Sequence, residues 1–314
     1  MRLLSALTPK VDWDALTPEQ AIDLRAAQDR KLGSAVGKLI TGKPDRGADI
    51  STHTLELPGR RLDVRLYRPV QGGTALPLIV AFHGGGFIGG TPAQDDWLLS
   101  HLAARLPAVV AAVDYRLAPE HPAPAQVEDA YAAVPRLVEQ AARWDADPGR
   151  LVLLGSSAGA TLAALTALAA NDLELRVRAQ VLINPQLDWT DQLFRYPSFT
   201  ENADAPTASP ANCRAFGRLV LPASFEARAM SPLYAADLTG AAPAIILAAG
   251  LDTLEDQAPA YADALARAGV ETTLIRYPEA THAFLSMPGA VPAARTARAD
   301  ILGYLRDHVL AARL

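Results

Sequence analysis

The sequence predicts an α/β protein with a mostly parallel central sheet and helices on both of its faces. Apolar runs of strand length alternate along the chain with stretches of helical periodicity, and strands joined through helices usually pair in parallel. Parallel sheets of this kind are buried on both faces, which suits strands that are apolar throughout. The expected strands are 52–57, 62–68, 76–82, 109–114, 151–154, 179–183, 244–249 and 272–277, and the expected helices are 17–33, 125–143, 158–170, 256–268 and 293–309.

Local signals mark the first helix and the first two strands. Thr17 is a suitable N-cap, Pro18 suits the first helical position, and Gln20 completes a capping box. Gly33 is a typical stop signal for the same helix. A Pro-Gly pair at 58–59 separates the two strand-like runs that follow, so we expect these strands to pair antiparallel.

The interval 188–240 breaks the alternation of strands and helices. It is far longer than an ordinary crossover and contains many Pro, Ser, Asn and aromatic residues. We expect it to join residues of about 1–48 in a helical cap, within a single domain that spans 1–314. Trp189 and Phe216 are its better candidates for lining a pocket, although aromatic residues in a large core more often serve packing.

Composition and charge narrow the classes of function. Half of the 314 residues are apolar and 20% are charged, which indicates a protein with a large core rather than a disordered chain. The formal net charge is −5 and the basic residues form no unbroken run, so we expect no nucleic-acid partner.

The single cysteine and the distribution of apolar residues bear on the compartment. Cys213 alone allows no intrachain disulfide and no cysteine-based metal site, and it fits a reducing cytoplasm. No apolar stretch reaches the roughly 18 to 20 uncharged residues of a spanning helix. The first residues also lack the apolar region of a signal peptide. We therefore expect a cytoplasmic protein with no membrane span and no bound metal.

The motif Gly155-Ser-Ser-Ala-Gly159 lies between an expected strand and an expected helix. A sharp turn at this place needs glycines beside the nucleophile, because side chains would clash, and it exposes the serine hydroxyl at the start of the helix. Only Ser157 has glycine two residues before it and two residues after it, whereas Ser156 does not. The spacing therefore predicts Ser157 as a nucleophile.

The motif His83-Gly-Gly-Gly86 follows the expected strand 76–82. Glycines let backbone N–H groups point into a cavity, where they stabilise the oxyanion that forms when a hydroxyl attacks an acyl carbon. The backbone N–H of Ala158, next to Ser157, is expected to be a further donor. The two motifs together indicate acyl transfer.

A dinucleotide-binding site is the competing interpretation of the same glycines. Residues 84–89 also fit G-x-G-x-x-G after a strand, and Asp114 lies where a ribose-binding acid would be expected. That fingerprint normally opens the first strand–helix unit, however, whereas two strand-like runs precede it in this chain. It would also leave the motif around Ser157 and the residue His282 without a role.

The order of Ser157, Asp252 and His282 matches the nucleophile, acid and base of α/β hydrolases. Both Asp252 and His282 follow expected strands, so we expect them at the same edge of the sheet as Ser157. Glu255 and Asp256 are rivals for the acid, and each is also placed to cap the helix that begins there.

The motifs together resemble the bacterial hormone-sensitive-lipase-like esterases, from about residue 52 onward. Besides the serine and glycine motifs, the resemblance rests on the segment 114–122, on Asp252-Thr-Leu254 and on His282-Ala-Phe284. It implies the α/β-hydrolase fold with a helical cap. It also implies hydrolysis of esters with short to medium acyl chains through an acyl-enzyme, with no cofactor. The implied oxyanion donors are the backbone N–H groups of Gly85, Gly86 and Ala158.

Several residues depart from the family pattern. Ser156 replaces an aspartate, Ala160 replaces a glycine, and Thr253 replaces a proline that would restrict the backbone beside the acid. The segment 114–122 is expected to anchor a loop beneath the glycine turn rather than to take part in chemistry.

The expected partner is a small ester, and two other functions stay open. An amide hydrolase would use the same three residues, and a ligand-binding protein on a hydrolase scaffold would need none of them for chemistry. An exposed edge strand at 272–277 would also allow a homodimer.

Overall fold

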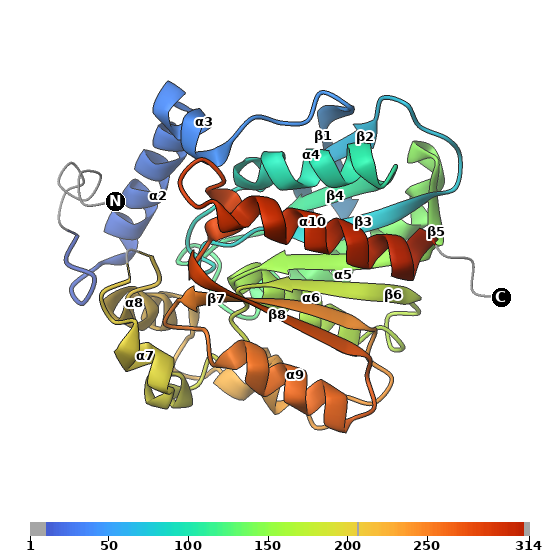
Figure 1. The fold of residues 1–314 in the computed structure, drawn as a ribbon. Coiled ribbons are helices and arrows are strands. Elements are labelled where there is room, and N and C mark those ends of the chain that lie inside the picture. Colours follow the sequence, from blue (N-terminus) through green and yellow to red (C-terminus); the bar gives the residue numbers. More distant parts are fainter. Residues whose placement is uncertain (1–10, 206, 311–314) are drawn as a thin grey trace.

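An eight-stranded, mostly parallel sheet forms the centre of the computed structural model, which describes residues 11–205 and 207–310 (Figure 1). The strand order is β1-β2-β4-β3-β5-β6-β7-β8. β2 pairs antiparallel with both β1 and β4, and the other neighbours pair in parallel. The strands are β1 (Ala48–Leu57), β2 (Arg60–Pro69), β3 (Leu76–Phe82), β4 (Val109–Asp114), β5 (Ala146–Ser156), β6 (Val177–Ile183), β7 (Ala244–Leu251) and β8 (Thr272–Thr281).

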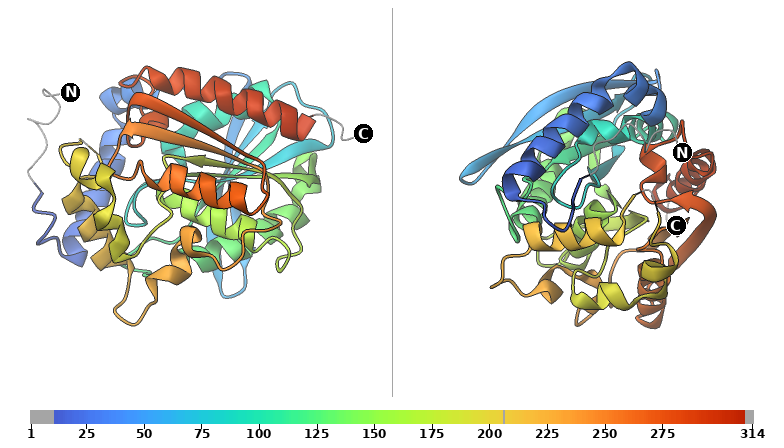
Figure 2. Two further views of the ribbon diagram at one scale, coloured as in Figure 1. Left: turned by 60° about the horizontal axis from the view of Figure 1, so that its bottom comes forward. Right: turned by 90° about the vertical axis from the view of Figure 1, so that its left-hand side faces the viewer.

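Helices cover both faces of this sheet, as Figure 1 and Figure 2 show. One face packs against α5 (Ala125–Glu139), α6 (Ala158–Leu168) and α9 (Gln257–Arg267). The other face packs against α4 (Asp96–Arg105) and α10 (Ala293–Leu305). The predicted α/β architecture is therefore confirmed.

The central strand β3 shows why its sequence is apolar at every position. Leu78, Val80 and Phe82 belong to the hydrophobic cluster of one face, whereas Ile79 and Ala81 belong to the cluster of the other face. Successive side chains of a strand point to opposite faces, so both sets must be apolar when both faces are covered.

All expected strands and helices are present, with some differences at their ends. The capping box of α2 (Pro18–Gly33) is confirmed by hydrogen bonds between Thr17 and Gln20 in both directions. The helix expected at 125–143 ends at Glu139 and is followed by a separate 3-10 turn. The helix expected at 293–309 ends at Leu305, beyond which the chain forms a π-helical turn.

The helix α4 was not predicted, although its sequence contains the signal. Its buried residues Leu98, Leu99, Leu102 and Ala103 recur at helical spacing and pack on the sheet. The short helix α3 (Ala35–Thr41) was also not predicted.

Four helices gather at the carboxyl end of the parallel strands (Figure 1). They are α2 and α3 from the start of the chain, and α7 (Pro197–Glu201) and α8 (Pro210–Val220) from the interval between β6 and β7. No helix in the described part of the chain is long and apolar enough to cross a bilayer.

Candidate active site

The turn between β5 and α6 holds Ser157 in a strained conformation. Its φ of 53° and ψ of −120° lie outside the regions that residues with side chains normally adopt. A Cβ atom on Gly155 would lie 2.2 Å from the carbonyl oxygen of Gly159, and one on Gly159 would lie 2.2 Å from that of Phe82. Only glycine therefore fits at either position, which explains the spacing of the motif.

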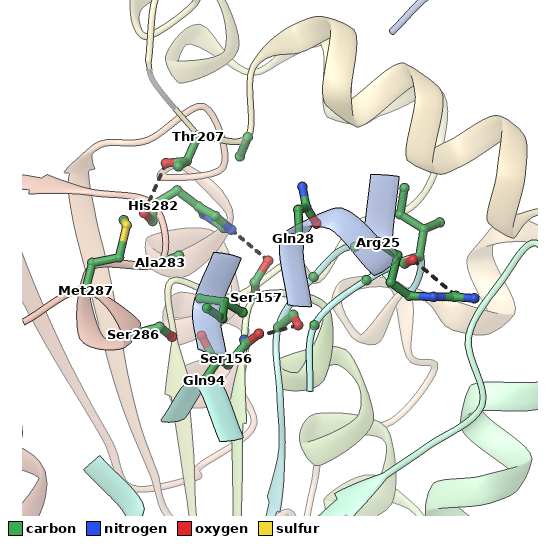
Figure 3. Close-up of a pocket in the computed structure, with 18 of the residues that line it drawn as sticks. Arg25, Gln28, Gln94, Ser156, Ser157, Thr207, His282, Ala283, Ser286 and Met287 are labelled. Carbon is green, nitrogen blue, oxygen red and sulfur yellow. Dashed lines mark hydrogen bonds between the residues drawn. The ribbon is translucent and has the colours of Figure 1, made fainter. Parts of the chain in front are cut away.

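The structure brings the three predicted residues into one hydrogen-bonded chain. His282 Nε2 lies 2.7 Å from Ser157 Oγ, and His282 Nδ1 lies 2.6 Å from Asp252 Oδ2. Figure 3 shows the His282 ring facing the Ser157 hydroxyl. Ser157, Asp252 and His282 follow β5, β7 and β8, whose carboxyl ends lie at one edge of the sheet, and all three side chains are buried.

The rival carboxylates have other partners. Glu255 forms an ion pair with Arg276, and Asp256 accepts a hydrogen bond from the backbone N–H of Ser198 at 2.7 Å. Asp252, by contrast, accepts from the ring of His282 and from the backbone N–H of Leu254. The geometry thus favours Asp252 as the partner of the histidine.

The glycine turn, formed by residues 83–86, lies against Ser157. A Cβ atom on Gly84 would lie 3.3 Å from Ser157 Cβ. Gly85 and Gly86 have φ values of 132° and 63°, which favour glycine. Ala158 is the first residue of α6, and the N–H groups of a first turn have no partner within their helix. The glycine motif and the start of α6 therefore both lie beside Ser157.

The segment 114–122 supports this turn, as expected. The Tyr115 hydroxyl donates to the carbonyl oxygen of His83 at 2.7 Å, and the Tyr115 ring stacks on the His83 ring at 4.3 Å. The backbone N–H of Ala118 donates to the carbonyl oxygen of Phe87 at 2.8 Å. Burial lowers the pKa of His83 to about 4, so this histidine is uncharged at neutral pH and supports the turn without a charge.

Arg25 of α2 contacts the backbone that follows the glycine motif and the segment 114–122. Its guanidinium donates to the carbonyl oxygens of Ile88 and Ala118 at 3.4 and 3.3 Å and forms an ion pair with Glu120. Figure 3 shows Arg25 among the residues that line the cavity. Arg25 could not be assigned this role from the sequence, because nothing in a helical sequence shows which carbonyl groups a surface arginine will meet.

A cavity of about 600 Å³ opens above Ser157, and its walls are mainly apolar. This volume is within the usual range for small-molecule sites. Phe216 of α8 lines the cavity, as expected, and its ring lies against Gly86. The other candidate, Trp189, instead has the packing role: its ring stacks on Phe87 at 4.9 Å and its indole N–H donates to Thr161 Oγ1 at 3.0 Å.

Side chains around α7 hold the loop that contains Asp252. Asn202 Nδ2 donates to the carbonyl oxygen of Asp252 at 3.0 Å, and Ser198 Oγ donates to that of Thr253 at 2.9 Å. In the other direction, Thr253 Oγ1 donates to the carbonyl oxygen of Ala208 at 2.5 Å. The threonine that replaces the family's proline therefore links this loop to the segment between α7 and α8.

The same segment is also bonded to the loop of the histidine. Thr207 Oγ1 donates to the carbonyl oxygen of His282 at 3.0 Å (Figure 3). The segment between α7 and α8 thus contacts the backbone of both residues that complete the hydrogen-bonded chain of Ser157. The sequence shows none of these contacts, because they join positions far apart in the chain.

A buried carboxyl group lies behind the wall of the cavity. Asp95 accepts a hydrogen bond from the Ser286 hydroxyl at 2.5 Å, and Ser286 lines the cavity. Burial raises the pKa of Asp95 to about 7, and the neighbouring Asp96 acts in the same direction. The Ser286 hydrogen bond opposes this rise without cancelling it.

This raised pKa predicts a dependence of stability on pH. The folded carboxyl of Asp95 keeps its proton up to about pH 7, whereas in the unfolded chain the same carboxyl loses it near the ordinary aspartate pKa of 3.8. The folded state therefore binds more protons between these values, and stability falls as the pH rises through this range. Relative to wild type, Asp95→Asn should gain up to about 4 kcal/mol in free energy of unfolding between about pH 4 and pH 8.

Urea unfolding of both proteins across this pH range measures the effect, with Asp23→Asn on the exposed side of α2 as control. A difference between wild type and Asp95→Asn that stays constant with pH would contradict the assignment.

Comparison with known proteins supports the architecture. A family model described as alpha/beta hydrolase fold matches residues 79–286. Esterase LipI of Mycobacterium tuberculosis is 36% identical over 299 residues, which is 92% of each chain. Ethyl acetate hydrolase of Pseudomonas putida is 35% identical and covers 91% of each chain.

Solved structures agree over nearly the whole length. The ester-hydrolase EH1AB1 from the metagenome of Lake Arreo has a TM-score of 0.88 at 30% identity, over 99% of this chain and 96% of the other. A thermostable esterase from Pseudomonas putida ECU1011 has a TM-score of 0.87 at 28% identity, over 99% and 97%. Because the family model matches more than half of the chain and curated esterases cover nine-tenths of it, the chain belongs to the α/β-hydrolase family, in the hormone-sensitive-lipase-like group of esterases.

Proposed function

We propose that the protein is a carboxylic ester hydrolase in which Ser157 is the nucleophile, His282 the general base and Asp252 the residue that orients the histidine. The observation that supports this most directly is the hydrogen-bonded chain from Ser157 Oγ through the His282 ring to Asp252 Oδ2. Each side chain lies within the distance that proton transfer or orientation requires.

The proposed reaction begins when Ser157 Oγ attacks the ester carbonyl and His282 Nε2 takes its proton. Asp252 accepts the Nδ1 proton of His282, which fixes the tautomer and stabilises the imidazolium ion that forms. The backbone N–H groups of Gly85, Gly86 and Ala158 stabilise the oxyanion. His282 then gives its proton to the leaving alcohol, and water repeats the sequence on the acyl-enzyme. Protein groups and water supply every step.

The substrate class follows from the shape and polarity of the cavity. We propose that α2, α3 and the interval 188–240 form a cap over a single catalytic domain, and that the cavity beneath it accepts esters with short to medium acyl chains. Apolar residues such as Leu32, Ile40 and Met287 line the cavity and suit an alkyl chain. The cytoplasmic location and the homodimer remain predictions from sequence alone.

Hydrolysis of p-nitrophenyl esters from acetate to laurate tests the proposal. Ser157→Ala should lower kcat by at least about ten-thousandfold, since it removes the attacking oxygen. Ser156→Ala changes the neighbouring hydroxyl and should keep turnover within about tenfold of wild type. Full activity in Ser157→Ala would exclude the assigned nucleophile, and hydrolysis of a matched p-nitroanilide in preference to the esters would indicate an amide hydrolase.

Gly86→Ala tests the proposed oxyanion site. The added Cβ would lie 2.4 Å from the Phe216 ring, and φ at this position is 63°, so the turn must shift. We expect kcat to fall roughly 100-fold or more, as for loss of one oxyanion donor. Gly303→Ala in α10 meets no atom within 4 Å and is the matched control, which should stay fully active. Turnover of Gly86→Ala equal to that of the control would count against the assignment.

Thr253→Val tests whether the link between the cap and the Asp252 loop matters for turnover. The change removes the hydroxyl at nearly constant shape and leaves the Ala208 carbonyl without this donor. We expect kcat to fall about tenfold with little change in KM, and equally for acetate and laurate, because the effect is on the geometry of the acid rather than on substrate binding.

Thr253→Ser keeps the hydroxyl and should restore turnover. Thr272→Val is the control. It removes a similar hydrogen bond, from the Thr272 hydroxyl to the Val270 carbonyl oxygen at 3.0 Å, at the start of β8 and so at the end away from His282. A loss that serine does not restore, or an equal loss in Thr272→Val, would show that the bond has no specific effect on the site.

A further inference from the structure

The short helix α3 forms both a wall of the cavity and part of the outer surface. Val36 and Leu39 are 62% and 76% exposed, which makes them the most exposed large apolar side chains within 11–205 and 207–310. Val36 also lines the cavity. An apolar surface therefore lies at the rim of the proposed substrate site.

Exposed basic residues flank these two side chains in the sequence. The segment 30–46 contains five basic residues and one acidic residue, a net charge of +4 in a chain whose formal net charge is −5. Three of the four lysines of the chain lie in this segment. All five basic side chains are exposed: Arg30, Lys31, Lys38, Lys43 and Arg46.

The one acidic residue of the segment, Asp45, is paired with a basic residue of α4 rather than with the basic residues of 30–46. Asp45 accepts hydrogen bonds from His101 Nδ1 and Arg105 Nε, both at 3.1 Å, and the Arg105 guanidinium balances its charge. The loop after α3 lies against α4, because a Cβ atom on Gly42 would lie 2.6 Å from the Trp97 ring.

The positive region continues from α4 onto α10. The Arg298 guanidinium lies 3.7 Å from the centre of the Trp97 ring. Burial lowers the pKa of Arg298, and nearby Arg295 and Arg105 add to this effect against the opposing charge of Asp45. In Figure 1, α3, α4 and α10 lie along the same side of the molecule.

An anionic lipid surface fits this combination of groups. Exposed apolar side chains ringed by Lys and Arg are typical of helices that lie in the headgroup region of a membrane. Each basic residue near such a surface strengthens binding roughly fivefold. A second copy of the chain fits poorly, because two faces of the same positive charge repel each other. A nucleic acid would not account for the exposed Val36 and Leu39.

We propose that the segment 30–46, together with Arg295, docks the protein on an anionic lipid–water interface. Docking places the cavity rim at Val36 against the lipid, so that an ester dissolved in the lipid enters without crossing water. This last step rests on the proposed esterase function, whereas docking itself does not.

Vesicle flotation of the full-length Ser157→Ala protein tests docking without turnover. We expect binding to vesicles of phosphatidylglycerol and phosphatidylcholine in equal amounts, little binding to phosphatidylcholine alone, and loss of binding at about 0.5 M salt. Lys38→Glu combined with Lys43→Glu should weaken binding at least about tenfold, and Leu39→Gln about fivefold. None of these three residues lines the cavity.

Matched controls distinguish an effect of this surface from an effect of the total net charge and from an effect of removing any exposed leucine. Arg61→Glu with Arg143→Glu makes the same change in net charge on exposed residues outside the surface, and Leu274→Gln replaces an exposed leucine of β8. Both controls should bind as the parent does. Absence of binding at low salt, or equal loss in the controls, would overturn the proposal. Loss of a dimer in Leu39→Gln without any vesicle binding would also overturn it, in favour of a second copy.

A second experiment measures ester hydrolysis by the same surface variants, made in the protein that keeps Ser157. Hydrolysis of soluble p-nitrophenyl acetate should stay unchanged in Lys38→Glu with Lys43→Glu, whereas hydrolysis of p-nitrophenyl laurate dissolved in the anionic vesicles should fall about tenfold. An equal rate on the vesicle substrate would overturn delivery of lipid esters. Vesicle binding by a protein that hydrolyses no ester would instead refute the proposed function and leave docking intact.

Discussion

The site depends on one strained residue held in a crowded turn. Ser157 adopts a left-handed φ that costs free energy, and the surrounding structure holds it there. Its N–H donates to the carbonyl oxygen of Ile183 at 2.9 Å, and its own carbonyl oxygen accepts from the N–H of Gln186 at 3.1 Å. The end of β6 therefore fixes the turn between β5 and α6, and the close approach of Gly159 to Phe82 fixes it against β3. The central strands must pair correctly before the hydroxyl can point into the cavity.

The groups around Ser157 come from separate parts of the chain, and polar contacts hold each of them. Tyr115 and Arg25 hold the glycine turn from two sides, and the segment between α7 and α8 holds the loops of Asp252 and His282. Most of these bonds end on backbone carbonyl groups, so they fix the path of the chain rather than the charge of a side chain. Apolar walls with few charges then leave the cavity suited to an uncharged ester.

The sequence was sufficient for the sheet and for the residues of the proposed reaction. Ser157, Asp252 and His282 could be predicted because each follows a strand, and parallel strands bring their carboxyl ends to one edge. The helix α4 was missed although Leu98 and Leu102 have helical spacing. The contacts of Arg25, Thr207 and Thr253 depend on how distant segments meet, and no local pattern encodes them. The choice between pocket and packing for Trp189 also depended on a tertiary contact, its stacking on Phe87. The excess of basic residues in 30–46 can be read from the sequence, but the exposure of Val36 and Leu39 and the position of this segment against α4 depend on tertiary structure.

The link between Thr253 and Ala208 bears on how such an enzyme can acquire new substrates. Side chains of α2 and α8 that face the cavity, such as Leu24 and Phe216, can change in size while the hydrogen bonds to the loops of Asp252 and His282 stay intact. Ser198, Asn202 and Thr207 have less of this freedom, because their hydrogen bonds hold the loops of Asp252 and His282. Variation that widens or narrows substrate choice is thus expected to accumulate on the two flanking helices, and libraries for directed evolution would gain most by randomising those helices and leaving the connecting segment untouched.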